Sequence, residues 1–399
     1  MGAFQSVPPG NAMAPILREE WPVSIPLLSA DSHVVEPVRL WTDGLEGRYR
    51  DRAPRVVWDA ERRGWYFVCD DLRPALVTSL YATDASPEEF AEGAEAVVEA
   101  ARAGGSDPAA RLKDMALDGV AGEVLYPSLA LHLFWLSDGA FQRACFRAYN
   151  DWLADYTRYA PERLAGLGLI SLWDTEAAVA ELRRCHGLGL RGAAVWASAP
   201  AERDFTGTAN DPFWQAAQEL GMPVSMHCLT GYRDSPRLFD YASPMGRIQR
   251  NMGYPEEIQH TLTDLIFSGI LQRFPGLDIV LAENDIGWIA YHLLHADRIY
   301  DKLGPALRTD LALPPSDYFR RQVHATFTDD EVGVLTMRRL GAGNFLWGSD
   351  YPHYEGSWPH SGEVLDRCLA DADEAARERV TSGNCARLYQ FDRAALTAE

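Results

Sequence analysis

The chain has 399 residues, of which 47% are hydrophobic and 24% charged, a composition typical of a globular protein and not of a disordered or low-complexity one. Lys and Arg number 37 against 57 Asp and Glu, and the resulting net charge of −20 would repel a phosphate backbone, so we expect no nucleic-acid partner. The longest stretch without these charged residues, 124–137, is shorter than a membrane span of about 20 residues, and we expect no membrane anchor.

The first residues and the cysteines predict where the protein resides. Residues 1–21 contain several Pro and Gly and no apolar run of signal-peptide length, which predicts a mobile arm and not a secretory leader. The six cysteines are scattered, with no C-x-x-C pair, which indicates reduced thiols. We therefore expect a cytoplasmic protein.

Short, largely apolar runs of the kind found in buried parallel strands recur eight times along the chain. They lie at residues 25–29, 122–126, 164–172, 190–196, 223–228, 277–283, 324–328 and 345–349. Helix-compatible segments lie between most of them, for example at 141–159, 175–186, 211–220 and 256–274. No phosphate-binding glycine loop follows the first strand, as a doubly wound sheet would require. The alternation predicts one α/β domain over 22–392, a distorted (β/α)₈ TIM barrel.

The segment between the first two predicted strands is far longer than one crossover helix. It contains a hairpin-like piece at 55–69 and a helical piece at 87–103. We therefore expect residues 43–118 to form an insertion over the barrel mouth.

Polar residues follow the strands at the ends where barrel active sites lie. Strand one ends in Asp31 and His33, strand five in His227, and strand eight in Asp350. Two carboxylates and two imidazoles form an N₂O₂ set that suits Zn²⁺ or Mn²⁺ in an open, catalytic site. A polar plug that caps the barrel is the alternative.

Four segments together resemble the amidohydrolase-related family of metal-dependent barrels, the branch that includes aminocarboxymuconate-semialdehyde and γ-resorcylate decarboxylases. The segments are Ala-Asp-Ser-His-Val-Val-Glu-Pro at 30–37, Met-His at 226–227, Ala-Glu-Asn-Asp-Ile-Gly-Trp at 282–288 and Trp-Gly-Ser-Asp-Tyr-Pro-His at 347–353. The resemblance implies a distorted barrel, one catalytic metal, frequent homodimers, and decarboxylation or hydrolysis of small acids, esters or amides.

Carried across by position, the family pattern places its metal ligands on Asp31, His33, His227 and Asp350. Decarboxylases of the family usually have a His on strand six, where this chain has Glu283. The resemblance therefore makes Glu283 a candidate ligand or acid/base. His353, in the loop after strand eight, is a second candidate acid or substrate contact, although it could also cap the next helix.

The same ligands serve two reactions. In the first, a small aromatic or unsaturated carboxylic acid loses CO₂, and Asp350 supplies a proton to the carbon, with Glu283 as its proton partner. In the second, Asp350 takes a proton from a metal-bound water that attacks an ester, lactone or amide. We expect the decarboxylase, with the hydrolase as the alternative; a barrel that only binds a ligand is the third possibility.

Three residues are candidates for substrate contact. His132 and Trp196 follow strands two and four and could stack on a flat substrate, although such residues also fill barrel cores. Arg233, in the loop after strand five, could clamp a substrate carboxylate or stay solvated.

Overall fold

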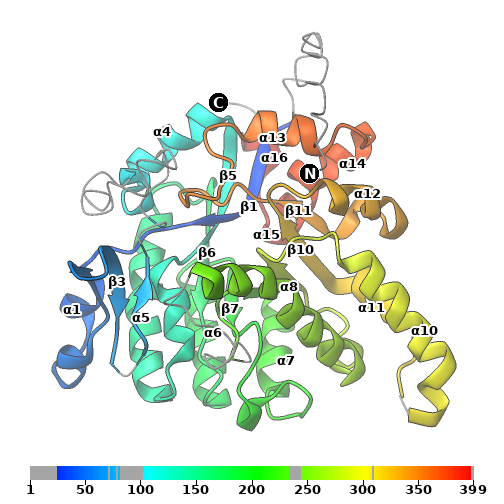
Figure 1. Cartoon of the computed structure of the whole chain (residues 1–399), viewed down its shortest axis with the longest axis horizontal. Helices are drawn as coiled ribbons and strands as arrows, with labels where there is room; N and C mark the ends of the chain where they lie inside the picture. Colours follow the sequence, from blue (N-terminus) through cyan, green and yellow to red (C-terminus); the bar gives the residue numbers. More distant parts are fainter. Residues whose placement is uncertain are drawn as a thin grey trace, which may run out of the picture.

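The fold is described from a computed structural model, which describes residues 25–70, 72–77, 80, 102–232, 244–307 and 310–396. Eight parallel strands follow one another around a sheet in chain order (Figure 1). They are β1 (Leu27–His33), β5 (Val120–Tyr126), β6 (Leu164–Leu169), β7 (Gly192–Val195), β8 (Val224–His227), β9 (Ile279–Ala282), β10 (Val323–Phe327) and β11 (Phe345–Trp347). Each lies within or overlaps one of the eight predicted runs, and the (β/α)₈ prediction is confirmed.

The sheet closes where the chain after β11 meets β1. The amide of Asp350 donates to the carbonyl of Asp31 at 2.8 Å, and the amide of His33 donates to the carbonyl of Tyr351 at 2.6 Å. A side chain at Gly348 would collide with Cβ of Asp31, so glycine is required for this close approach. The closure brings the two ends of the barrel sequence, and the polar residues they carry, into direct contact.

Helices surround the barrel (Figure 1). They are α4 (Pro108–Asp118), α5 (Gly139–Thr157), α6 (Thr175–Gly187), α7 (Asp211–Leu220), α8 (Pro244–Phe267), α9 (Ile270–Arg273), α10 (Ile289–Leu307), α11 (Pro315–Gln322), α12 (Glu331–Leu340), α13 (Ser361–Cys368), α14 (Glu374–Glu378), α15 (Asn384–Tyr389) and α16 (Arg393–Leu396), with short 3₁₀ turns η4 (Leu129–Trp135), η5 (Ala201–Arg203) and η6 (Ala342–Asn344) and a π turn η7 (Arg379–Gly383). Aspartates begin several of them: the carboxylates of Asp107, Asp138 and Asp174 accept hydrogen bonds from first-turn amides of α4, α5 and α6.

The helix-compatible segment 256–274 is divided between two helices. α8 begins before it, at Pro244, and is separated from α9 by Gly269. Gly269 has a φ of +77°, a left-handed conformation that ends a helix and that glycine adopts without strain.

The insertion after β1 contains α1 (Leu40–Gly44), η1 (Gly47–Arg52), a three-stranded antiparallel sheet and η3 (Ala103–Gly105). The strands are β2 (Arg55–Asp59), β3 (Gly64–Val68) and β4 (Ala75–Leu76), so the predicted hairpin at 55–69 is confirmed. The predicted arm at 1–21 and most of the predicted helix at 87–103 lie outside the described residues.

Two apolar cores support the barrel. The inner core contains Leu28, Val124 and Val280 from the strands, and Leu388 and Tyr389 of α15 complete it. The larger outer core lies between the strands and the helices. All six cysteines are buried and none forms a disulfide bond, as expected for core thiols.

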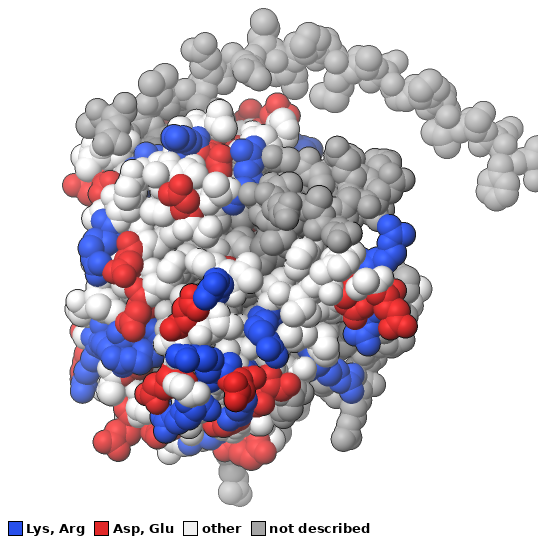
Figure 2. Space-filling model, turned by 90° about the vertical axis from the view of Figure 1, so that its left-hand side faces the viewer, with Lys and Arg blue, Asp and Glu red and all other residues white. Residues whose placement is uncertain are grey.

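Acidic and basic side chains alternate on the outer surface. Figure 2 shows them interspersed on one face of the molecule. On α5 and α6, for example, Arg184 pairs with both Asp151 and Glu181. Within the described residues, no helix is both long enough and apolar enough for a bilayer span.

Candidate metal centre

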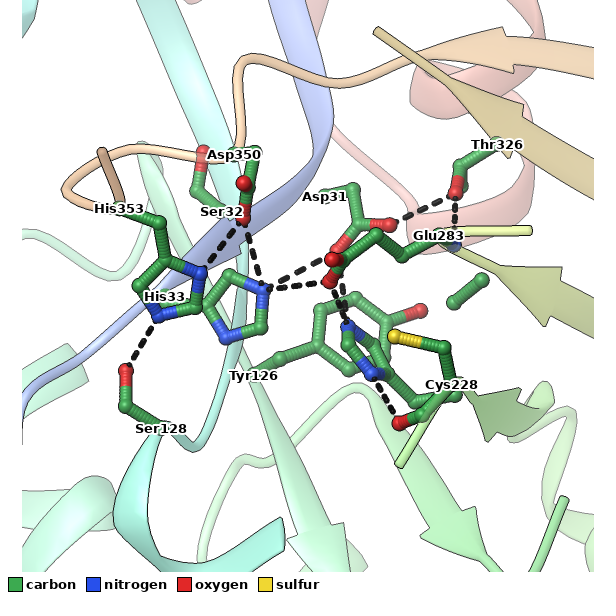
Figure 3. A network of polar contacts seen from close by, with 12 residues as sticks. Asp31, Ser32, His33, Tyr126, Ser128, Cys228, Glu283, Thr326, Asp350 and His353 are labelled. Carbon is green, nitrogen blue, oxygen red and sulfur yellow. Dashed lines mark hydrogen bonds and ion pairs between the residues drawn. The ribbon is translucent and has the colours of Figure 1, made fainter. Parts of the chain in front are cut away.

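The polar residues predicted from the strand ends converge at one end of the barrel (Figure 3). Asp31 and His33 lie at the C-terminal end of β1, and His227 is the final residue of β8. Glu283 directly follows β9, and Asp350 lies just beyond β11. Five side chains from four strands that are far apart in the sequence therefore face one small volume.

Four buried atoms in this volume have no hydrogen-bond partner among the described residues. They are Oδ1 of Asp31, Nε2 of His33, Nε2 of His227 and Oδ1 of Asp350. Leaving one buried polar atom unsatisfied costs about 1–3 kcal/mol, so four of them at one point require an explanation. These atoms belong to the four predicted metal ligands, and a divalent cation would supply the missing partner of those of Asp31, His33 and His227, which lie in one group.

The candidate ligand atoms fall into overlapping groups that share His33. Those of Asp31, His33 and His227 lie within 4.8 Å of one another, and so do those of His33, Glu283, Asp350 and His353. Nε2 of His33, which belongs to both groups, lies 3.7 Å from Asp31 Oδ1 and 3.3 Å from Asp350 Oδ1. The residues present therefore fit a mixed nitrogen and oxygen site of the kind that binds Zn²⁺ or Mn²⁺.

Backbone carbonyls orient both imidazoles. Nδ1 of His33 lies 2.7 Å from the carbonyl oxygen of Pro127, and Nδ1 of His227 lies 2.8 Å from that of Cys228. Because a carbonyl can only accept, each Nδ1 carries the proton and donates it. Each Nε2 then presents a lone pair to the centre, which is how metal-binding histidines are usually held.

Glu283 is the most open of the three carboxylates. Its side chain is 28% exposed, against 4% for Asp31 and 6% for Asp350. Its Oε2 lies 3.0 Å from Nε2 of His227 and 3.6 Å from Nε2 of His33. Glu283 is thus close to both imidazoles and is the carboxylate of the three that solvent reaches most easily.

The backbone is strained at two of these carboxylates. Glu283 has a φ of +52° and Asp350 a φ of +55°, in the left-handed region that residues other than glycine rarely adopt. Such conformations cost about 1–3 kcal/mol and cluster at functional sites. Here they turn each carboxylate toward the centre directly after its strand ends.

The centre carries a negative potential. Burial, together with the charge of Glu283, raises the pKa of Asp350 well above its ordinary value. Burial opposes a charge on His227, but Cys228 and Glu283 raise its pKa well above 6.5. For Glu283 itself burial also opposes the charge, yet the imidazoles of His227 and His33 lower its pKa well below 4.5. Three carboxylates around two imidazoles would attract a cation.

His353 points into the site and not toward the following helix. Its Nδ1 lies 2.8 Å from Oδ1 of Asp350, and its Nε2 lies 2.8 Å from Oγ of Ser128 (Figure 3). Its ring centroid is 4.0 Å from that of His33. His353 therefore contacts Asp350 directly, which is the position that a second acid would need.

Two of the three candidate substrate contacts pack against aromatic neighbours, and the third lies outside the described residues. Trp196 is 1% exposed, donates its indole N–H to the carbonyl of Phe134 at 2.8 Å and packs edge-on against Trp173. His132 is 5% exposed in η4, with its ring 5.6 Å from that of Phe67. Arg233 lies outside the described residues. Trp196 and His132 thus take part in packing, and their contact with a substrate stays a prediction.

Sequence reasoning missed two hydroxyl groups. Thr326 in β10 donates to Oδ2 of Asp31 at 2.6 Å, and Ser128 contacts His353. Both residues stand at or just beyond a strand end, but a hydroxyl there predicts no role until its hydrogen-bond partner is known.

Comparison with known proteins places this arrangement in a family. The family model described as amidohydrolase matches residues 57–391. The chain is 24% identical over 268 residues to γ-resorcylate decarboxylase of a Polaromonas species, covering 65% of this chain and 80% of the relative. It is 23% identical to 2-amino-3-carboxymuconate-6-semialdehyde decarboxylase of Dictyostelium discoideum, covering 72% and 77%.

A solved structure shares the fold. The crystal structure of 5-carboxyvanillate decarboxylase from Novosphingobium aromaticivorans, complexed with manganese and 4-hydroxy-3-methoxy-5-nitrobenzoic acid, superimposes with a TM-score of 0.68. The two chains are 20% identical, and the match covers 95% of this chain and 100% of the other. The matching family model spans most of the chain, and the protein belongs to the amidohydrolase family.

Proposed function

We propose that the protein is a metal-dependent decarboxylase of a small aromatic or unsaturated carboxylic acid, with one Mn²⁺ or Zn²⁺ held by Asp31, His33, His227 and Asp350. The observation that carries the proposal is the group of four buried, unsatisfied atoms, one from each of these residues, at one end of the barrel. The relatives named as decarboxylases, and a manganese-containing structural neighbour, support this reaction over others.

The bound ion would act as a Lewis acid that holds an anionic substrate and draws electron density from it. Asp350 would donate a proton to the carbon that carries the carboxylate. The bond from that carbon to the carboxylate then breaks, its electron pair neutralises the protonated carbon, and CO₂ leaves. His353, whose Nδ1 lies 2.8 Å from Oδ1 of Asp350, is placed to exchange a proton with Asp350. Glu283, the most exposed carboxylate, would act as a ligand or as a second proton partner.

The test combines metal analysis with a substrate screen. Purified protein is assayed for CO₂ release from hydroxybenzoates and unsaturated dicarboxylates and for hydrolysis of esters and lactones, before and after chelation. We expect about one transition metal per chain and CO₂ release that chelation abolishes and Mn²⁺ or Zn²⁺ restores. Chelator-sensitive hydrolysis without CO₂ release would establish the alternative reaction. A protein inactive in both assays after metal is restored would favour a binding barrel.

We also propose that the protein is a cytoplasmic homodimer. Apolar side chains such as Met245, Met252 and Tyr291 are more than half exposed on α8 and α10, and covering them would be favourable. The absence of disulfide bonds among the six cysteines is consistent with a reducing compartment. Sedimentation equilibrium tests the dimer, and fractionation of cells tests the compartment.

A further inference from the structure

Ser128 has a hydroxyl whose hydrogen bonds determine the tautomer of His353. Its Oγ donates to the carbonyl oxygen of Val34 at 2.7 Å and lies 2.8 Å from Nε2 of His353. A hydroxyl carries one proton, and the carbonyl can only accept it. The hydroxyl oxygen must therefore accept a hydrogen bond from His353, so Nε2 of that imidazole carries a proton.

This tautomer directs the other ring nitrogen to Asp350. Nδ1 of His353 lies 2.8 Å from Oδ1 of Asp350, so the imidazole forms a bridge between Ser128 and that carboxylate (Figure 3). The chain of contacts from Ser128 through His353 to Asp350 has the composition of a Ser-His-Asp catalytic triad. The hydrogen bonds, however, run in a different direction. Ser128 is 1% exposed, and its proton is engaged with Val34 and not with the imidazole. The hydroxyl is thus an anchor for the ring and not a nucleophile.

Ser128 is itself held on both sides. The carbonyl of the preceding residue, Pro127, accepts a hydrogen bond from Nδ1 of His33. The amides of the next two residues, Leu129 and Ala130, donate to the two carboxylate oxygens of Glu36 at 2.9 Å each. The Pro127-Ser128 dipeptide therefore orients two imidazoles whose centroids are 4.0 Å apart, one through a carbonyl and the other through a hydroxyl.

We propose that Ser128 is a positioning residue for the decarboxylation proposed above, on which this inference rests: it acts through His353 to keep that imidazole directed at Asp350. Without the hydroxyl, the imidazole of His353 loses the acceptor that distinguishes its two nitrogens. The ring can then rotate about its bond to Cβ and exchange the positions of the two nitrogens. The proton path to Asp350 would then be disordered, whereas Asp31, His33 and His227 would keep their contacts with the metal.

The kinetic test is a double-mutant cycle of Ser128→Ala and His353→Ala in the metal-loaded enzyme. Outer partners of site residues are typically worth about 10–100-fold, so we expect Ser128→Ala to lower kcat by that factor while KM and metal content change less than about twofold. In the His353→Ala background, Ser128→Ala should change kcat by less than about twofold, because its route of action is gone. An undiminished effect in that background would overturn the proposal, and so would loss of kcat only in proportion to lost metal.

Ser357→Ala is the matched control. Ser357 is also buried, lies in the same loop as His353, and forms hydrogen bonds to Ser361 and Ser349 and none to His353. We expect its kcat to stay near that of the wild type. If Ser357→Ala lowers kcat as much as Ser128→Ala does, the effect is one of loop stability, and the positioning role is wrong.

A second measurement is independent of turnover. In ¹⁵N-histidine-labelled, metal-loaded protein, NMR reports which ring nitrogen of His353 carries the proton, with the signal assigned by His353→Asn. We expect a protonated Nε2 in the wild type and a shift toward a mixture of ring states in Ser128→Ala. A His353 signal that is unchanged in Ser128→Ala would overturn the inference even if CO₂ release is confirmed. The expected shift in a protein without CO₂ release would instead show that the proposed reaction, and not the anchor, is wrong.

Discussion

The hydroxyl of Thr326 donates a 2.6 Å hydrogen bond to Oδ2 of Asp31, across the barrel closure from β10 to β1. The same hydroxyl accepts a 2.8 Å hydrogen bond from the backbone amide of Glu283. One side chain therefore orients a predicted metal ligand and the turn that carries the most exposed carboxylate of the site. Because Oδ2 of Asp31 is engaged with Thr326, Oδ1 is the oxygen left for the ion.

We expect Thr326→Val, which keeps the shape of the side chain and removes its hydroxyl, to weaken metal binding by about 10–100-fold. Asp31 loses the donor that holds its carboxylate, and the amide of Glu283 loses its acceptor. Titration of the chelated protein with Mn²⁺ measures the effect. Thr326→Ser, which keeps the hydroxyl, is the control and should bind metal nearly as the wild type does. Equal affinities for the Val and Ser variants would contradict a role for this hydroxyl.

The strand pattern predicted the barrel because parallel barrel strands are buried on both faces and appear as short apolar runs. The proposed metal ligands follow from the same pattern, because barrel sites form where strands end and Asp31, His33, His227 and Asp350 all stand there. Thr326 and Ser128 were missed because a hydroxyl at a strand end carries no chemical signal until its partner is known. That partner depends on the register of strands β1, β5 and β10, which only the folded barrel specifies.

Asp350→Asn tests the proposed proton donor. The variant keeps the size of the side chain and removes its charge and its proton, so we expect kcat to fall by at least about 10²-fold, the range of general acid catalysis. The loss of a buried carboxylate near two others should leave the fold intact, as circular dichroism and thermal unfolding would show. Turnover close to that of the wild type would exclude Asp350 as the acid.

Glu283→Gln distinguishes the two roles left open for Glu283. If the carboxylate is a proton partner, kcat falls by about 10²-fold while the metal stays bound. If it is a ligand, metal content falls with activity and excess Mn²⁺ restores part of both. Metal analysis of the same samples used for kinetics separates these results. Glu355→Gln, at a neighbouring carboxylate whose pKa is raised by burial and by Glu283, is a matched control for the local change in charge.

The ion pair of Arg111 and Glu123 supports β1 from behind the site. The Nε of Arg111 donates to Glu123 at 2.5 Å, and its Nη1 donates to the carbonyl of His33 at 2.6 Å. Both side chains are almost fully buried. Removing one partner leaves a buried charge uncompensated, so Arg111→Leu should lower the free energy of unfolding by about 3–5 kcal/mol.

The double variant Arg111→Leu/Glu123→Leu should recover part of this loss, because neither charge is then left alone. Arg158→Leu, which removes an exposed pair with Asp155, is the control and should cost about 1 kcal/mol or less. Urea unfolding of the wild type, the two single variants and the double variant gives the free energy of unfolding of each. A double variant less stable than Arg111→Leu would contradict an uncompensated charge on Glu123 as the source of the loss.

Glu36 makes the stability of the loop after β5 depend on pH. Burial raises the pKa of its carboxyl from 4.5 to about 7, although the amides of Ala130 and Leu129 donate to it and oppose the shift. A folded-state pKa above the unfolded value means that the native state binds the proton more tightly. The stabilisation is therefore complete below pH 4.5 and is lost as the pH rises through about 7. This pKa shift corresponds to a change of about 3 kcal/mol in the free energy of unfolding between low and high pH.

Glu36→Gln should flatten this dependence. The amide cannot titrate, but its NH₂ group can accept nothing from the backbone, so we expect the variant to be about 1 kcal/mol less stable than the wild type at pH 5. At pH 8 the difference should vanish or reverse, because the wild type then carries the cost of a buried charge. Urea unfolding at the two pH values measures both numbers, with Glu61→Gln, at an exposed turn, as the control. A wild type whose unfolding free energy changes no more between pH 5 and 8 than that of Glu36→Gln would show that Glu36 stays ionised in the native protein.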